Sequence, residues 1–569
     1  MSRTNILQKT IKWLFYIILA WFILAVIINP ILSVIQTSLW PQGALNLRAV
    51  EKVFKSQRAM ESIRNSFLLA VCLTFSCNIL GLFMVLVTDY FEIKGANLLR
   101  LIYMTTLLMG GMVMNFGYLL VYGKNGFITQ LLALIFPKMN IYWFEGFGPV
   151  LFIMTLGCTH IHMLFLRNAI RSIDFHLLEA ARLLGSNPMQ VLRKVALPTI
   201  LPVMLTLIIM TFQTGLGAFS APVMVGGKNF QTISPLILTF ANRPRSRDIA
   251  AVLSVFLGLC QILLLFFITR NERKSNFLSV SKTQAKLHKQ KINLPWLNAL
   301  IHTLAYTLAA LFLLPFAAII VASFTQGAAL RQSTLSLNHL TLANYYKIFS
   351  RLDHLQPIIT SISYSAIAAV GAVLLITLVG RILQKSKHDW KANILEYSFY
   401  IPWLVPSLML ALGYLMAYDQ PSRLLLGHSV IGSWWILPLA YLVISLPNSL
   451  RYIKAAYFGL SPQLEEASQL LGASKIRTFI KVLLPILLPT ILALIAIQFN
   501  QLIDDYDLSV FLYQPSNPTL GIEIRQNANP DTNIDAQAIN AVYSVVLMGI
   551  KGAALYFIYG SSDRKNKIN

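Results

Sequence analysis

The sequence is poor in charged residues. Asp, Glu, Lys and Arg make up only 12% of its 569 residues, whereas 56% are hydrophobic. An average soluble chain is roughly a quarter charged. The composition therefore argues against a water-soluble enzyme, a disordered scaffold and a fibrous protein.

Acidic residues are scarcer still. The 22 Asp and Glu are outnumbered by 46 Lys and Arg, which gives a formal net charge of +24. In a soluble protein this excess would indicate nucleic-acid binding, but in a membrane protein it marks loops that stay in the cytoplasm. Because the chain is so hydrophobic, we expect a lipid bilayer around it and no nucleic acid as a partner.

Patterns for catalysis or metal binding are also missing. The chain has no GxxxxGK[ST] phosphate loop, no zinc spacing and no Ser/His/Asp arrangement. His160 and His162 would point to different helix faces, so we expect polar packing there rather than a shared metal. The cysteines lie inside apolar runs, which indicates packing rather than disulfides. They are Cys72, Cys77, Cys158 and Cys260. We predict no catalytic residue, no metal and no cofactor bound by this chain.

The sequence contains long hydrophobic runs instead. A helix needs about 20 apolar residues to cross a bilayer, and twelve runs approach this length, which predicts an all-α polytopic membrane protein. They lie near 13–37, 66–88, 99–122, 148–167, 198–219, 249–269, 298–324, 357–380, 393–417, 429–450, 485–503 and 541–560. The first is longer than the core of a cleavable signal peptide, so we count it as a span.

The basic residues predict the topology, because Lys and Arg next to spans stay on the cytoplasmic side. With both termini inside, the cytoplasmic segments hold 29 of the 46 Lys and Arg, and the opposite loops hold 16. The external loop 38–65 runs against this bias with five basic residues. The longest polar break, 271–295, is predicted to be a basic cytoplasmic linker between two six-span units, 1–270 and 296–569.

The two units are related by an internal repeat at an offset of 287 residues. Residues 179–202 read EAARLLGSNPMQVLRKVALPTILP, and residues 466–489 read EASQLLGASKIRTFIKVLLPILLP. The same offset carries Phe219 onto Tyr506. Since each unit has an even number of spans, both copies have the same orientation and the repeat is parallel.

The repeated segment is predicted to form a helix, a turn and a second helix at the membrane surface. Four apolar residues are spaced as one stripe along the first helix. They are Leu177, Leu178, Ala181 and Leu184. Gly185 and Gly472 fit helix C-caps, which need a left-handed backbone. Pro198 and Pro485 suit the first turn of the next span.

These residues resemble the EAA loop of permease subunits of bacterial ATP-binding-cassette importers. The shared features are Glu-Ala-Ala, a glycine six residues after the Glu, and Leu-Pro twelve residues after the glycine, in the loops 168–197 and 453–484. The second copy departs only at Ser468, which is small like the alanine it replaces. The resemblance covers nearly the whole chain and implies a type I importer permease fold with one permease unit in each half.

The resemblance also implies partners. In that family the loop helix docks into a cleft of a cytoplasmic ATPase subunit, which binds the ATP and passes its closure to the spans. Two ATPase copies, an extracytoplasmic substrate-binding protein and a place in the bacterial inner membrane are thus implied. The coupling residues implied are Glu179, Ala180, Ala181, Gly185 and Pro198 in the first loop and Glu466, Ala467, Ser468, Gly472 and Pro485 in the second. ATP binding would bias a two-state rocking of the units.

The cargo is less closely defined. Fused permeases of this kind look most like the iron(III), thiamine, phosphonate and polyamine branch of the importers. The segments GAFSAPVMVGG (217–227) and TLANYYKIF (341–349) resemble the iron(III) type. Iron(III) is therefore the first expectation, with thiamine, a phosphonate or phosphate ester and polyamine as alternatives.

Three aspartates are candidates for the translocation path. Asp504, Asp505 and Asp507 follow the eleventh span, and the first unit has no acid at the matching positions. Ionisable groups beside spans are functional candidates, because they are costly to place in hydrocarbon. The aspartates either line the path or lie solvated at the external mouth. Lys551, inside the last run, either snorkels or pairs with one of them.

Two other protein classes fit the sequence less well. A twelve-span secondary transporter is also built from parallel halves. It would carry a basic and acidic signature between spans two and three, which FEIKGANLLR lacks, and it would not account for two EAA loops. A membrane enzyme or assembly factor would need catalytic clusters of polar residues, and the sequence shows no such cluster. A transport subunit without enzyme activity is the main hypothesis.

Overall fold

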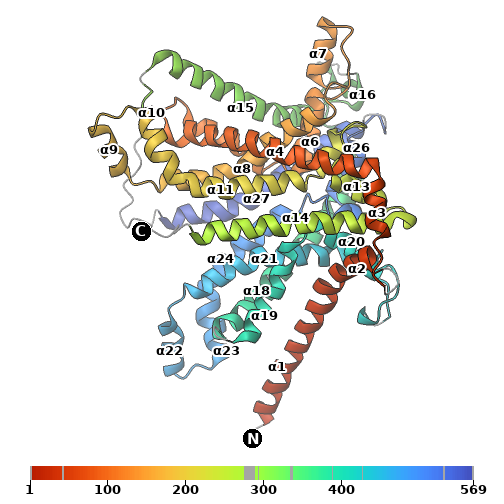
Figure 1. The fold of residues 1–569 in the computed structure, drawn as a ribbon, viewed down its shortest axis with the longest axis vertical. Coiled ribbons are helices and arrows are strands. Elements are labelled where there is room, and N and C mark those ends of the chain that lie inside the picture. Colours follow the sequence, from red (N-terminus) through yellow and green to blue (C-terminus); the bar gives the residue numbers. More distant parts are fainter. Residues whose placement is uncertain are drawn as a thin grey trace.

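The protein is almost entirely helical. A computed structural model describes residues 3–40, 44–274, 289–292, 294–332, 337–386, 389–425, 427–529 and 532–566. Within these residues there are isolated β-bridges but no strand. Long helices run side by side, with short helices at both ends of the bundle (Figure 1). Most of the predicted linker 271–295 lies outside the described residues.

The first unit begins with one continuous helical run that includes a π-helical turn. This run is α1 (Arg3–Trp21), the π segment Phe22–Ile28 and α2 (Asn29–Leu39). The elements that follow are α3 (Arg48–Lys55), α4 (Gln57–Val85), α5 (Ala96–Tyr103), α6 (Gly111–Tyr122), α7 (Phe127–Ile135), α8 (Phe147–Arg171), α9 (Phe175–Leu183), α10 (Pro188–Val191), α11 (Leu197–Leu216), α12 (Ser220–Val225), α13 (Ile233–Ala241) and α14 (Arg247–Lys274).

The second unit repeats this order. Its elements are α15 (Pro295–Ser323), α16 (Gly327–Arg331), α17 (Ala343–Ser350), α18 (Leu352–Lys385), α19 (Trp390–Leu404), α20 (Ser407–Tyr418), α21 (Ile436–Phe458), α22 (Pro462–Leu470), α23 (Lys475–Thr478), α24 (Leu484–Leu502), α25 (Ser509–Leu512), α26 (Leu520–Asn527) and α27 (Ala536–Asn566). Single contacts repeat as well. The Ser66 hydroxyl accepts the N–H of Ile233 at 2.8 Å, and the Ser361 hydroxyl accepts that of Leu520 at 2.8 Å.

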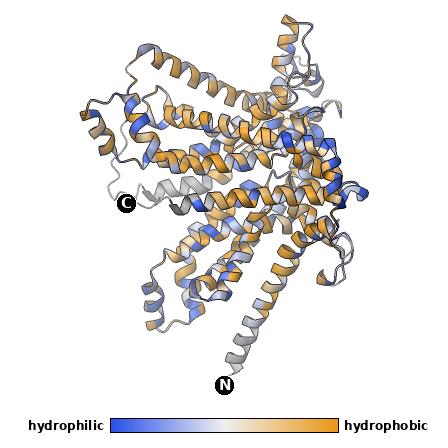
Figure 2. Ribbon diagram, in the orientation of Figure 1, coloured by the Kyte–Doolittle hydropathy of each residue, from blue (hydrophilic) through white to orange (hydrophobic). Residues whose placement is uncertain are grey.

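The predicted number of spans is confirmed. Among the described residues, 11 helices are long and apolar enough to cross a membrane, and the number is 12 if the bent pair α19 and α20 counts as one span. Hydrophobic residues cover the long helices, while hydrophilic residues gather at their ends (Figure 2). This distribution is the one expected for helices whose middle parts face hydrocarbon.

The third predicted span of each unit is broken. Instead of one helix over 393–417, α19 and α20 meet at an angle of 102°. Val405, between them, is extended because it precedes Pro406, and a residue before proline disfavours the helical region. In the first unit, the run 99–122 is divided into α5, a 3₁₀ turn and α6, with Gly110 extended at the break.

Each unit's first span packs against the broken span of the other unit. α2 lies along α20, and α15 lies along α6. Glycine permits both close approaches. A Cβ on Gly413 would lie 2.4 Å from the carbonyl oxygen of Pro30, and one on Gly117 would lie 2.9 Å from the Cβ of Pro315. The two units are therefore interlocked rather than merely adjacent.

A tyrosine reinforces each of these crossings. Pro30 and Pro315 have no N–H to offer the carbonyl four residues earlier, which loses its usual helical partner. The hydroxyl of Tyr414 donates to the carbonyl of Val26 at 2.8 Å, and that of Tyr118 donates to the carbonyl of Leu311 at 3.3 Å. Each tyrosine directly follows the crossing glycine. The sequence Gly-Tyr-Leu therefore serves the same interlock in both units.

Replacing Gly413 with valine should destabilise the interlock. The added atoms would overlap the backbone of α2, and overpacking costs about 1–3 kcal/mol or more. We expect a lower midpoint of thermal aggregation for G413V in detergent, measured by size-exclusion chromatography of heated samples. Gly549→Val is the matched control, because a Cβ at Gly549 would meet nothing within 4 Å. Equal midpoints for the two variants would contradict the interlock.

Candidate coupling loops and translocation path

The two repeated loops fold as short capped helices at one end of the bundle. The carboxylate of Asp174 accepts the backbone N–H of His176 at 3.0 Å and caps α9. The hydroxyl of Ser461 accepts that of Gln463 at 3.3 Å and caps α22. α9 and α22 lie on the same side of the molecule, opposite α3 and α7 (Figure 1). A partner on that side can reach both helices.

Each of these helices ends in the same hydrogen-bonded turn. In the first loop, the N–H of Gly185 bonds the carbonyl of Arg182 at 2.8 Å, and that of Ser186 bonds Ala181 at 3.1 Å. The second loop repeats both bonds around Gly472, at 2.9 and 3.1 Å. The φ angles of the two glycines are 86° and 81°, in the left-handed region that glycine adopts without strain. The predicted C-cap turns are confirmed.

Two leucines before each glycine point away from the protein. Leu183 and Leu184 are 89% and 87% exposed, and Leu470 and Leu471 are 88% and 89% exposed. Large apolar side chains exposed at the same place in both units indicate a docking surface. The predicted single stripe is therefore only partly right, because Leu178 is buried while Leu184 faces outward. The signal for the outward pairs was the Leu-Leu-Gly that occurs in both copies.

The predicted acidic and small residues divide between two faces of these helices. The exposed ones are Glu179, Ala180, Glu466 and Ala467. Ala181 and Ser468 are half-buried. Ala181 packs against the hydrophobic core, and the Ser468 hydroxyl lies 3.0 Å from that of Thr478 at the start of the next span. Ala181 and Ser468 thus serve the attachment, while the glutamates, Ala180 and Ala467 share the outward face with the leucines.

Pro198 and Pro485 lie in the first turn of α11 and α24, as predicted, but the helical run of each span begins earlier. Pro198 is the second residue of α11, but α10 and a π-helical turn, Leu192–Ala196, run into α11 without a break. Pro485 follows the π turn Phe479–Leu483 in the same way. A π turn ahead of a proline changes the local hydrogen-bond register, so the helix can continue through a residue that lacks an N–H.

Two of the three aspartates have contacts of their own. Lys551, in α27, donates to Asp504 Oδ1 at 2.9 Å, and both side chains are only 7% exposed. Of the two alternatives for Lys551, snorkelling or pairing with an aspartate, the structure shows the pairing. The same carboxylate lies against the break before α6, where a Cβ on Gly110 would be 1.0 Å from Asp504 Oδ2. Asp505 accepts the backbone N–H groups of Leu508 and Ser509 at 3.1 and 3.2 Å, which orders the turn before α25.

The third aspartate, Asp507, faces a cavity of about 350 Å³ between the two units. The polar side chains that line it come from both units: Gln213, Thr214 and Gln261 from the first, and Ser407, Asn448 and Asp507 from the second. Among the lining residues, which all belong to the described part of the chain, Asp507 is the only charged one. The cavity can therefore offer hydrogen bonds and at most one negative charge.

Repeat-related aromatic rings meet where the units join. Phe219 and Tyr506 are stacked at 5.4 Å with an interplanar angle of 25°, and both are buried. Because the repeat maps one ring onto the other, the stack lies on the pseudo-symmetry axis. Asp507 is the residue after Tyr506, so the contact lies directly beside the cavity. A rocking motion of the units would have to move this stack.

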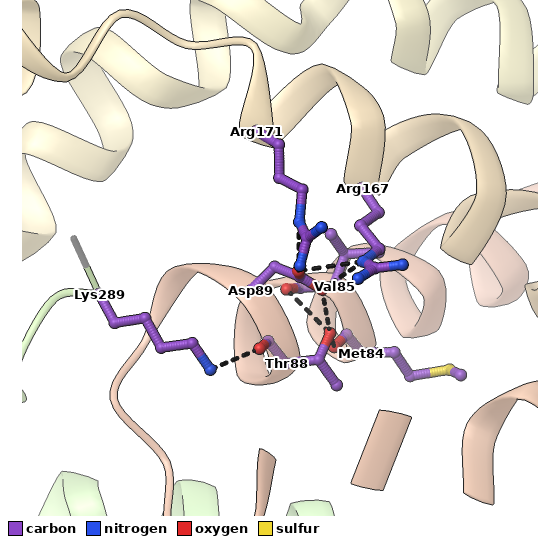
Figure 3. A network of polar contacts seen from close by, with 7 residues as sticks. All are labelled: Met84, Val85, Thr88, Asp89, Arg167, Arg171 and Lys289. Atoms are coloured by element: carbon purple, nitrogen blue, oxygen red, sulfur yellow. Dashed lines mark hydrogen bonds and ion pairs between the residues drawn. The ribbon is translucent and has the colours of Figure 1, made fainter. Parts of the chain in front are cut away.

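A buried ionic network at the end of α4 was not predicted. Asp89 is 5% exposed and pairs with Arg167 at 3.0 Å and Arg171 at 2.7 Å, both on α8. Both arginines point toward Asp89, while Lys289 reaches the carbonyl of Thr88 at 2.7 Å (Figure 3). The network joins α4, α8 and the segment that precedes α15. A lone Asp in a membrane span paired with arginines two spans away was the available signal.

His162 shows the expected polar packing. Its Nε2 lies 3.0 Å from Asn78 Oδ1, and the Asn78 amide donates to Thr211 at 3.0 Å. In the described part of the chain, no group of three or more His, Cys, Asp or Glu could hold a metal ion. The polar network instead connects α4, α8 and α11 inside the first unit.

Comparison with known proteins agrees with this architecture. The family model of the binding-protein-dependent transport system inner membrane component matches residues 2–275 and 376–565. The chain belongs to this family. Its members are permease subunits, and the two matched regions correspond to the two repeats of a type I permease fold. The family membership lends no support to the alternative of a secondary transporter.

Two of the relatives extend over most of the chain, and a third matches less than half of it. The probable ABC transporter permease protein y4fN of Sinorhizobium fredii is 34% identical over 557 residues, which cover 98% of this chain and 97% of that protein. The ferric transport system permease protein FbpB of Actinobacillus pleuropneumoniae is 23% identical over 92% of this chain and 75% of its own length. The putative 2-aminoethylphosphonate permease PhnU of Salmonella typhimurium is 25% identical and matches 42% of this chain and 86% of its own.

Removing one partner of the Lys551–Asp504 pair should lower the stability of the protein. Lys551→Met would leave a buried carboxylate without its cation, a change that typically destabilises by about 3–5 kcal/mol. We expect K551M to aggregate at a lower temperature than the wild type in detergent. The double variant with Asp504→Asn should recover most of the loss, because no uncompensated charge remains. Wild-type stability of K551M would show that the pair is not needed.

Proposed function

We propose that this chain is the fused permease of a binding-protein-dependent importer in the bacterial inner membrane, with both termini in the cytoplasm and one ATPase subunit docked on each unit. The observation that carries the proposal is the pair of matching helices α9 and α22. Both end in the same glycine turn, both expose two leucines, and both lie on one side of the membrane bundle. The distribution of Lys and Arg supports that side as the cytoplasmic one.

The transport path would run through the cavity between the units. There the cargo would meet hydrogen-bonding side chains and Asp507, while Asp504 and Asp505 hold the surrounding turns. The chain would not hydrolyse ATP itself, because no phosphate loop is present in its sequence. ATP binding to the docked subunits would bring α9 and α22 together and tilt the two interlocked units.

Iron(III) is the cargo that we propose. A ferric permease is among the relatives that match over most of the chain. The charge of the cavity supports a cation, since Asp507 is the only ionisable residue among the described ones that line it. Thiamine and polyamines, which are also cations, are the nearest alternatives. A free phosphonate or phosphate ester fits less well, because no Lys or Arg lines the cavity to bind an anion.

Replacing both turn glycines should uncouple ATP hydrolysis from transport. A side chain at φ near +80° is strained, and a leucine there would also project into the docking surface, which is open in this structure. We expect G185L with G472L to abolish uptake while the protein is still made and inserted normally. Uptake of radiolabelled iron(III) into cells, with and without the ATPase gene, measures this. Undiminished uptake, in this variant or without the ATPase, would refute the proposal.

Removing the charge of Asp507 should reduce cation transport without affecting assembly. Asp507→Asn keeps the size of the side chain but removes the only charge in the cavity, so we expect a several-fold fall in iron(III) uptake at unchanged protein level. Asp353→Asn removes an exposed acid outside the cavity and is the control. Equal uptake by both variants would show that the cavity charge does not select the cargo.

A further inference from the structure

The two coupling helices are attached to the membrane bundle by different chemistry. The repeat offset of 287 aligns α9 with α22, so their inward-facing residues can be compared one by one. Leu178 in α9 corresponds to Glu465 in α22. Leu178 is 0% exposed and belongs to the hydrophobic core, whereas Glu465 makes ion pairs. An apolar contact in the first unit is thus replaced by a charged one in the second.

The charged contact joins α22 to the end of a membrane span. Arg381, near the end of α18, donates from Nη2 to Glu465 Oε1, and the Lys385 ammonium lies 3.6 Å from the same oxygen. The side chain of Arg381 is 12% exposed and that of Glu465 is 22% exposed. The hydrogen bond from Arg381 lowers the pKa of the Glu465 carboxyl below its ordinary value, so the pair is charged at neutral pH.

Arg381 is itself held in place. Its Nη1 donates to Gln384 Oε1 at 2.6 Å, and the Gln384 amide donates to the carbonyl of Tyr457 at 3.1 Å on α21. The hydroxyl of Tyr457 in turn donates a hydrogen bond to the carbonyl of Thr377 on α18, at 3.0 Å. α18 and α21 are therefore bound together at the point where Glu465 attaches. A movement of α22 would therefore displace both α18 and α21.

A second substitution between the units follows the same trend. Ser468 and Thr478 are in hydrogen-bond contact at 3.0 Å in the second unit. The matching residues of the first unit are Ala181 and Val191, which are apolar, and Val191 is 0% exposed. At two independent positions the first coupling helix is held by packing and the second by polar contacts.

The first unit also has an acidic residue at the corresponding end of a span, but this residue does not pair with the coupling helix. Asp89, at the end of α4, pairs with Arg167 and Arg171 of α8, not with a residue of α9. In the described part of the chain, the Glu179 carboxylate lies 3.9 Å from His176 of the same helix. Among the described contacts, no ion pair joins α9 to a membrane span. The ionic attachment is a feature of the second unit.

We propose that Arg381 and Glu465 are positioning residues that transmit the movement of α22 to spans α18 and α21. The inference rests on the proposed docking of an ATPase subunit on α22. Apolar packing tolerates sliding of one surface over another, whereas a partly buried, geometrically fixed ion pair does not. The second unit is thereby the one whose spans follow the ATPase more rigidly.

The test uses the complete complex of this chain with its ATPase in proteoliposomes. Thr214→Cys, in a background with the four native cysteines replaced, reports on the central cavity through its rate of labelling by a thiol reagent. Trapping ATP with vanadate should change that rate when Glu465 is intact. With Glu465→Gln, we expect the ATP-dependent change to shrink by about fivefold or more, the usual range of a coupling between two sites.

Glu396→Gln is the matched control. Glu396 is also half-buried, lies at the same end of the same unit and pairs with Lys454, but this pair joins α19 to α21 and not to α22. We expect E396Q to keep the wild-type response. The charge-swapped variant R381E with E465R should recover the response that E465Q loses, which a general loss of stability would not allow.

The outcomes distinguish a failure of the proposed function from a failure of the role proposed for the ion pair. If the ATPase does not bind the wild-type chain, the proposed function fails. If the ATPase binds wild type and E465Q equally and both show the same ATP-dependent change in labelling, only the positioning role of the ion pair is overturned. Equal loss in E465Q and E396Q would also overturn it.

Discussion

Inside a bilayer every backbone polar group needs a partner from the protein, because hydrocarbon offers none. This constraint explains the reciprocal crossing of the two units. The first span of each unit contains a proline that frees a carbonyl at membrane depth, and a tyrosine of the other unit donates to it. A glycine next to the tyrosine brings the backbones close enough for that bond. Each unit therefore completes the hydrogen bonding of the other, and neither first span is satisfied alone.

Buried charged side chains likewise need a partner from the protein. Lys551 and Asp504 neutralise each other beside the break before α6, and Asp89 is surrounded by two arginines. Once these groups are paired, Asp507 is the acid that remains turned toward the cavity between the units. Asp507 is left as the acid facing the cavity because Asp504 pairs with Lys551 and Asp505 accepts backbone hydrogen bonds. In the proposed mechanism, a rocking motion would expose one carboxylate to the cargo without uncovering a larger charged cluster.

The two coupling helices show how a repeat can diverge while its outward face is kept. Their glycine turns and exposed leucines are the same, which suits the proposed docking of one ATPase subunit on each unit. Their inward faces differ, with Leu178 in one unit and Glu465 in the other. Because one chain carries both units, each inward face has its own sequence. The two faces are thus free to use different chemistry, as long as each still holds its helix in place.

The sequence by itself determined the number of spans, the parallel repeat and the left-handed glycine turns. These features follow from local quantities: the length of an apolar run, the spacing between similar segments and the φ angle that glycine permits. The sequence did not show that the third span of each unit is broken, that π turns carry the helices through Pro198 and Pro485, or that the leucines before Gly185 and Gly472 face outward. Nor could it choose which aspartate faces the cavity. Only the tertiary structure decided these points. Prolines permit the break and the π turns, but which side chains face outward and which acids are neutralised depends on residues that are distant in the sequence.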